Sequence, residues 1–141
     1  MIYLLDTDHI SFVHRISADG SRILRRLAAV RREDVYLSVV SYEEQTRGRL
    51  AEINRCRTAR EQLTHYRKLG TLLDLYCATP VLQFDELAVE AFEQLVRGRP
   101  RVGTMDLKIA AIALANDATL LTRNAADFGR IPGLRFEDWS V

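Results

Sequence analysis

Acidic side chains recur in this sequence near the points where apolar, strand-like segments end. The chain opens with MIYLLDTDHI, in which the apolar run from Ile2 to Leu5 leads directly into Asp6 and Asp8. Further acids or amides stand near three later boundaries, at Glu44, Asp106, Asn124 and Asp127. Carboxylates are the side chains that Mg²⁺ and Mn²⁺ prefer as ligands. Such an ion, with an activated water, could carry out in-line displacement at phosphorus.

The segments that would position these acids alternate between strands and helices. Buried strands are predicted at residues 2–5, 35–40, 81–84 and 118–122, with an edge strand at 135–139. Helices are predicted at 8–15, 21–30, 41–50, 85–96 and 105–117, and a long helix at 52–76, which Gly70 could divide and Pro80 ends. This alternation favours a single α/β domain over residues 1–141, with a parallel sheet covered by helices on both faces.

In such a sheet, ligands bind outside the carboxyl ends of the strands. Asp6 and Asp8 follow the first strand, and Glu44 lies in the first turn of the helix after the second. Asp106 opens a helix that is apolar almost all round, and Asp127 comes soon after the fourth strand. Because like charges raise one another's pKa, a carboxylate cluster needs a divalent cation to offset the repulsion. The positions therefore predict a Mg²⁺ or Mn²⁺ site at one edge of the sheet.

Each acid also has a local explanation, which the sequence leaves open. Asp6 and Asp8 could cap the first helix, and Asp106 could cap the buried one. Glu44 stands three residues after Ser41, which is the spacing of a capping box. His9 flanks the first acids but stands five residues from His14, the wrong spacing for a shared helix face, so it is interpreted as a structural histidine, with contact to a substrate phosphate as the alternative.

Composition and charge narrow the class of protein. The chain is 48% hydrophobic and 28% charged with a net charge of +1, which is ordinary for a globular domain. All but two of its 20 basic residues are arginine. The arginines gather in residues 15–32 and 47–68, whereas five acids and no base stand in 72–93. Because arginine bonds both phosphate and carboxylate, these groups suit solvated helix faces, a nucleic-acid backbone or an acidic protein.

Location follows from what the sequence does not contain. No apolar run approaches the ~20 residues of a membrane span, and the first residues do not have the pattern of a signal peptide. A cytoplasmic protein is therefore expected. Cys56 and Cys77 are interpreted as reduced core residues on one long helix, too far apart for a disulfide.

Four motifs in this order resemble those of the PIN-domain ribonucleases, in particular the VapC-type toxins of bacterial toxin–antitoxin pairs. YLLDTDHIS resembles the opening strand, with Asp6 at the first metal-binding aspartate. LSVVSYEEQTRG resembles the second motif, in which counting back from Gly48 selects Glu44. TMDLKIAAIAL resembles the third and places Asp106 at a metal aspartate. LLTRNAADFGRIPGLRFEDW is similar to the family's ending and includes Trp139.

Two positions depart from the family's pattern. Many PIN domains have an acid at the position of Asn124, and Asp127 is expected to substitute for it here. Asp8 stands where an asparagine is common and receives a secondary role. The resemblance therefore implies Asp6, Glu44, Asp106 and Asp127 as catalytic and metal-binding residues, with Asp8 and Asn124 as secondary candidates.

The resemblance implies a three-layer α/β/α PIN-like fold with a central, mostly parallel sheet of four to five strands. It also implies an endoribonuclease toxin that hydrolyses RNA, such as tRNA, with Mg²⁺ or Mn²⁺ and a metal-activated water. A homodimer and a small antitoxin partner are implied as well. The apolar stripe of the long helix beginning at Glu52 is expected to supply part of a dimer or antitoxin surface.

Two other functions fit parts of the sequence. A catalytically weak PIN-like module that binds RNA or a partner is consistent with Asn124 in place of an acid. LLDTDHI also resembles the opening of haloacid-dehalogenase-like phosphatases, in which the first aspartate is a nucleophile. That motif continues with Thr or Val where this chain has Ile10, and its later lysine and paired acids have no clear match here.

Overall fold

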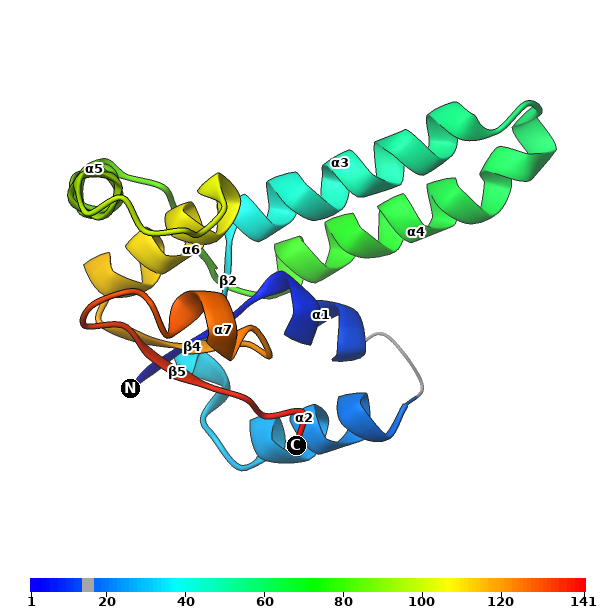
Figure 1. The fold of residues 1–141 in the computed structure, drawn as a ribbon. Helices are drawn as coiled ribbons and strands as arrows, with labels where there is room; N and C mark the ends of the chain where they lie inside the picture. Colours follow the sequence, from blue (N-terminus) through cyan, green and yellow to red (C-terminus); the bar gives the residue numbers. More distant parts are fainter. Residues whose placement is uncertain (14–16) are drawn as a thin grey trace.

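A five-stranded sheet forms the centre of the molecule in the computed structural model, which describes residues 1–13 and 17–141 (Figure 1). The strands are β1 (Ile2–Leu5), β2 (Val35–Ser38), β3 (Val81–Leu82), β4 (Ala118–Leu121) and β5 (Arg135–Glu137). Their order is β3-β2-β1-β4-β5, and every neighbouring pair is parallel. The expected α/β fold is confirmed, and its sheet is parallel throughout.

Helices cover both faces of this sheet. They are α1 (Thr7–Val13), α2 (Ala18–Ala28), α3 (Val39–Arg55), α4 (Ala59–Ala78), α5 (Glu86–Arg97), α6 (Thr104–Ala115) and α7 (Ala125–Phe128), with a 3₁₀ turn at Arg32–Asp34. The predicted helix at 8–15 extends past α1 into positions outside the described residues. No helix in the described ranges is long and apolar enough to cross a membrane.

Side chains of the central strands alternate between two cores, as the pleat of a strand requires. On one face, Leu4 of β1 and Leu120 of β4 pack with Ile109 of α6 and Ala88 of α5. On the other face, Leu5 and Leu121 pack with helices α1 and α2. The arrangement is therefore three-layered, α/β/α, as expected. Helix α6 is buried over most of its length, as its nearly continuous apolar sequence predicts.

The prediction of one long helix over 52–76 is wrong. Helix α3 ends at Arg55, and α4 begins after Thr58, whose side chain accepts a hydrogen bond from the Glu61 amide. The missed signal is this Thr-x-x-Glu capping pattern, because the apolar spacing carries on across the break. Gly70 lies inside α4 without interrupting it. The two helices run back against each other and project from the body as an arm (Figure 1).

Helix α3 also begins earlier than predicted. Its N-cap is Ser38, which accepts from the Ser41 amide at 3.0 Å, so Ser41 is not the cap. Residues 39–40 are therefore helical, and Glu44 lies in the second turn, beyond the capping box. The cysteines do not share a helix either. Cys56 caps α3 and is partly exposed, whereas Cys77 is exposed on α4; both thiols are free.

We predict that Arg99→Gly raises the free energy of unfolding by about 0.5–1 kcal/mol. Arg99 follows the end of α5 with a φ of 49°, in the left-handed region that is costly for a side chain and favourable for glycine. Arg97→Gly is the matched control. It lies in the last helical turn and should lower the free energy of unfolding by a similar amount. Urea denaturation of both variants measures the two signs, and a loss of stability in Arg99→Gly would contradict the prediction.

Candidate active site

Asp6 is fixed where β1 and β4 end side by side. It is only 6% exposed, and its amide donates to the Leu121 carbonyl at 2.9 Å, which continues the ladder between the two strands. One carboxylate oxygen accepts from the Thr7 amide at 2.8 Å, and the other from the Thr122 hydroxyl at 2.8 Å. Burial and these two bonds hold the carboxylate in one orientation.

Asp8 is tied to the end of the chain through His9. The fully buried His9 ring lies 2.8 Å from Asp8 through Nδ1, and its Nε2 accepts from the Trp139 amide at 3.0 Å. The other Asp8 oxygen accepts from the Arg123 amide at 2.9 Å. Burial raises the pKa of Asp8, but the bonds from His9 and Arg123 outweigh it and hold that pKa below its usual value. His9 is thus a satisfied structural histidine, as expected.

Glu44 lies near the start of α3, and its side chain contacts α1. Its Oε1 accepts from the Thr7 hydroxyl at 2.9 Å, and the same hydroxyl lies 3.0 Å from the Ser41 hydroxyl. Burial raises the pKa of the Tyr76 phenol, and the charge of Glu44 raises it further. The Tyr76 hydroxyl donates to Gln45 at 2.6 Å, so this phenol remains protonated beside the glutamate.

Asp106 and Asp127 come from the starts of two helices. Helix α6 has Gly103 as its N-cap, so Asp106 does not cap it but lies in its first turn. Helix α7 is capped by Asn124, which accepts from the Asp127 amide at 3.3 Å and donates to the Asp127 carboxylate at 3.0 Å. The amide at the variant position therefore holds the nearby acid in place.

The carboxylates influence one another across these segments. Burial raises the pKa of Asp6 to about 7, with Asp8 and Asp106 adding to the effect. Burial also raises the pKa of Asp106, to which the charges of Glu44, Asp127 and Asp8 contribute. These five acids, which follow different strands or open different helices, thus share one electrostatic environment at the carboxyl edge of the sheet.

The types of side chain at this edge suit a metal ion, but their present positions do not. An all-carboxylate donor set, in which the pKa values of Asp6 and Asp106 are raised, is what a hard divalent cation would stabilise. However, no three His, Cys, Asp or Glu side chains in residues 1–13 and 17–141 lie where they could hold an ion together as they stand. The metal site therefore remains a prediction based on the types of side chain present. These side chains would have to move closer together to bind one ion.

Sequence reasoning missed the two threonines that organise the site. Thr122 is fully buried; its hydroxyl lies 2.8 Å from Asp6 and 3.3 Å from Asp8, and it accepts from the Asn124 amide at 3.0 Å. Thr7 connects β1 to α3 through Glu44. The available signal was a hydroxyl residue directly after a buried strand, at the same edge as the acids.

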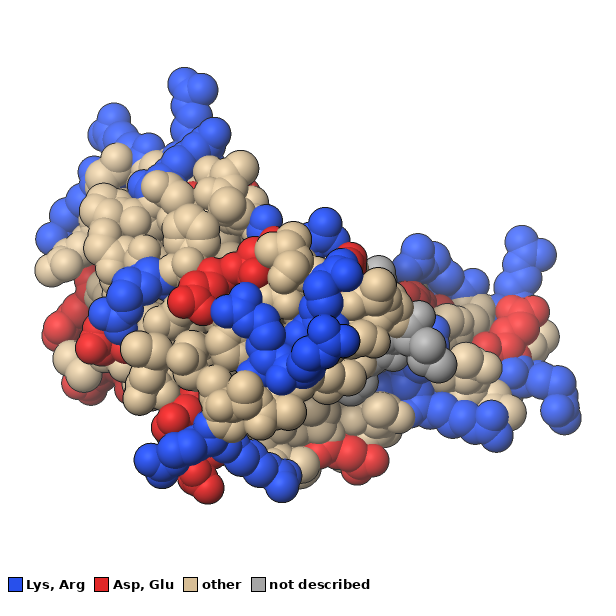
Figure 2. Space-filling model, turned by 90° about the horizontal axis from the view of Figure 1, so that it is seen from below, with Lys and Arg blue, Asp and Glu red and all other residues tan. Residues whose placement is uncertain are grey.

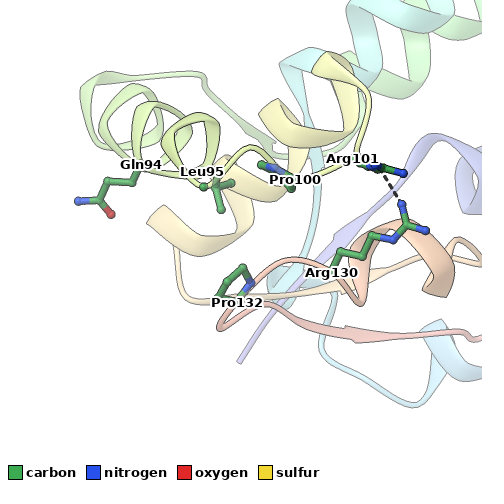
Figure 3. A pocket seen from close by; sticks show the side chains of 7 residues that line it. Gln94, Leu95, Pro100, Arg101, Arg130 and Pro132 are labelled. Carbon is green, nitrogen blue, oxygen red and sulfur yellow. Dashed lines mark hydrogen bonds between the residues drawn. The ribbon is translucent and has the colours of Figure 1, made fainter.

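Two hollows adjoin this edge. One, of about 260 Å³, lies between the end of α5 and the loop after α7, and Arg101 and Arg130 stand at one end of it (Figure 3). The other, of about 580 Å³, is bounded by Ser11 of α1 and by polar side chains of the arm, including Arg49, Arg67 and Lys68. The second hollow combines cations with α1 and α3, which carry Asp8 and Glu44, whereas the first is lined by α5 and by the loops before α6 and after α7.

Basic side chains on one face of the molecule stand in separate groups (Figure 2). Figure 2 shows the face covered by α2, where Lys and Arg occur in separate groups with acids between them. Several arginines there are paired: Arg22 with Asp19, and Arg26 with Glu137 at 3.8 Å. Solvated, ion-paired helix faces therefore account for these arginines, in agreement with the low net charge.

Comparison with known proteins points to one family. Residues 3–134 match the family model described as PIN domain. The chain is 31% identical to Ribonuclease VapC1 of Haemophilus influenzae (strain R2866), over 99% of each protein. It is also 32% identical to the tRNA(fMet)-specific endonuclease VapC of Salmonella typhimurium, over 57% of this chain and 64% of that protein.

A solved structure supports the fold independently. VapBC-1 from nontypeable Haemophilus influenzae superimposes with a TM-score of 0.77 at 24% identity, covering the whole of both chains. This likeness extends to the long arm and the closing strand, since no part of either chain is left out of the match.

We predict that, in EDTA, the protein loses stability as the pH rises from about 4 to about 7. Folded Asp6 binds its proton more tightly than the unfolded chain does, so ionisation in this window costs the folded state up to about 4 kcal/mol. Melting temperature against pH measures the effect. Asp6→Asn should flatten the curve, whereas the exposed control Glu90→Gln should not. A wild-type curve that rises through this window would refute the prediction.

Proposed function

The chain belongs to the PIN domain family, and we propose that it is a Mg²⁺- or Mn²⁺-dependent endoribonuclease that acts as the toxin of a toxin–antitoxin pair. The observation that carries the proposal is the electrostatic coupling of acids from separate segments at the carboxyl edge of the sheet. The Haemophilus influenzae relative, which matches over 99% of each protein, is named a ribonuclease. This name supports the same reaction class.

The residues proposed to hold the metal are Asp6, Glu44, Asp106 and Asp127. When bound, a divalent cation supplies charge neutralisation and an activated water for hydrolysis of a phosphodiester bond. Binding requires the four carboxylates to draw together, and their mutual repulsion is what opposes this in the free protein.

The remaining residues of the edge have positioning roles in this proposal. Thr7 and Thr122 hold the carboxylates of Glu44 and Asp6. Asp8 is already engaged by His9, Arg123 and Thr122, so it is a positioning residue and a poor ligand. Asn124 acts in the same way on Asp127.

RNA is the proposed substrate, and tRNA is one class suggested by the Salmonella typhimurium relative. Arg67 and Lys68 line the hollow beside α1, together with Thr64. The hollow is therefore suited to an RNA backbone, because these cationic and hydroxyl groups can bind phosphates. Gln45 lines the same hollow and follows Glu44 in α3, so RNA bound there would lead directly to the acids.

Association through the arm is proposed as well. One side of the hairpin exposes apolar side chains of both helices around a hollow of about 470 Å³: Tyr42 and Leu50 from α3, and Tyr66 and Leu73 from α4. Exposed apolar patches of this kind mark protein–protein contacts. We assign this surface to a second copy of the chain, in a cytoplasmic toxin whose other partner is a small antitoxin.

The first test is RNA cleavage by the purified protein. We expect it to cut a structured RNA in Mg²⁺ or Mn²⁺ and to be inactive in EDTA. Asp6→Asn and Asp106→Asn should each lower the rate about 100-fold or more, because each removes a proposed metal ligand. Gel analysis of the end-labelled RNA measures cleavage.

Glu90→Gln is the control, since it removes an exposed acid of α5 far along the chain from these carboxylates. Equal cleavage by all four proteins would show a contaminating nuclease and remove the proposal. Binding of RNA without cleavage, unaffected by divalent ions, would instead establish the non-catalytic PIN-like module.

The second test concerns the arm. We expect light scattering to show a dimer of the wild-type chain and a monomer of the Leu50→Glu, Leu73→Glu variant, because buried carboxylates would oppose the contact. Leu87→Glu is the control: Leu87 is more exposed than either leucine and lies on α5, and its replacement should leave the dimer intact. A wild-type chain that is monomeric at every concentration would refute the assignment.

A further inference from the structure

We propose that the hollow between α5 and the loop after α7 binds one nucleotide of the RNA beside the bond that is cut, with its base in the hollow and its phosphate on Arg101 and Arg130. This inference rests on the proposed ribonuclease function and adds to it a place that grips the substrate.

The lining of the hollow divides into two chemically different parts. Leu95, Pro100 and Pro132 give it apolar walls, and Gln94 stands at its outer edge with an amide that can both donate and accept. Figure 3 shows Arg101 and Arg130 together at the opposite end, reached from two different loops. The volume, about 260 Å³, suits a single flat group. A base with a phosphate on one side has this combination of properties.

The two arginines are available for an anion. Arg130 donates through Nη1 to the Arg101 carbonyl at 2.9 Å, which holds the two residues together and leaves most of its donors free. Among the residues that the structure describes, neither guanidinium has a carboxylate within ion-pair distance, in contrast to Arg22 and Arg26. Paired guanidinium groups without acids are a typical receptor for phosphate.

The backbone connects this hollow to the proposed catalytic acids. The Arg130 amide donates to the Asp127 carbonyl at 3.1 Å, so Arg130 closes the turn that Asp127 begins. Arg101 stands two residues before Gly103, the N-cap of the helix that carries Asp106. At most about 20 Å of extended backbone therefore separates each arginine from an acid. RNA held at the arginines can reach the acids without a change of fold.

The hollow continues along α5 and α6. A second depression, of about 470 Å³, shares Gln94, Leu95 and Pro132 with it and runs on to Leu114 and Ala115. An RNA chain leaving the nucleotide site thus has an apolar path away from the acids.

The experiment compares two double variants with the same change of charge. Arg101→Gln, Arg130→Gln removes the proposed contacts. Arg57→Gln, Arg60→Gln removes two exposed arginines at the far tip of the arm. Binding of a mixed-sequence, fluorescently labelled single-stranded RNA is measured by anisotropy in the Asp106→Asn background, over a range of salt concentrations. Cleavage kinetics are measured with the active proteins, and melting temperatures confirm that all of them fold.

We expect the Arg101, Arg130 double variant to bind RNA about tenfold or more weakly. The slope of log affinity against log salt should fall in magnitude by about 0.7, the value for one phosphate contact on a single strand. KM should rise by a similar factor with kcat nearly unchanged. An abasic nucleotide at one position next to the cut should weaken wild-type binding and cost the double variant much less.

Three results would overturn the inference, and they are distinguishable from failure of the proposed function. If the wild-type protein cleaves RNA and both double variants match it in affinity, salt slope and KM, the nucleotide site is wrong while the nuclease stands. If the variant loses binding of an acidic antitoxin peptide but not of RNA, the hollow is a protein site. If the wild-type chain neither binds nor cleaves RNA, both proposals fail.

Discussion

Burial of carboxylates close to one another at the end of a parallel sheet is the constraint around which this molecule is arranged. Asp6 is almost fully buried and lies within the influence of Asp8 and Asp106, an unfavourable arrangement for charged groups. The fold tolerates it because hydroxyl and amide donors are fixed on the same carboxylates. Thr122 contributes most, since its hydroxyl lies near both Asp6 and Asp8.

The sheet order explains why residues so far apart in the sequence share this edge. Strands β1 and β4 are neighbours although more than a hundred residues separate them, so Asp6 and Thr122 meet across one strand pair. Parallel strands end at the same side, and each of β1 to β4 is followed by a helix whose first turns face that side. Helix α6, buried among the apolar side chains, brings Asp106 to the edge as part of its packing.

The sequence predicts the strands and the buried helix well because their signals are local. Four apolar runs of suitable length and an almost wholly apolar helix specify the sheet and its central cover. The site was less predictable. Which serine caps α3 depends on where β2 ends, and Ser38 and Ser41 are equally good caps by composition. Likewise, the role of Asn124 depends on a bond to Asp127 within a single turn.

The arm had a local signal, the capping pattern of Thr58 and Glu61, which the apolar spacing concealed, whereas the closing segment depends on a contact that no local pattern records. The apolar spacing of 52–76 runs through the break at Thr58 because both helices of the hairpin use the same repeat. The bond from Trp139 to His9 joins residues 130 positions apart, so nothing near either residue predicts it.

That bond has a consequence for synthesis on the ribosome. A growing chain cannot complete the Asp8–His9–Trp139 connection until residue 139 has been added and has left the exit tunnel. Strand β4, which supplies Thr122, is also translated late. For most of translation the nascent protein therefore carries its first acids without Thr122 and Trp139, and the acidic edge of the sheet is completed only near release.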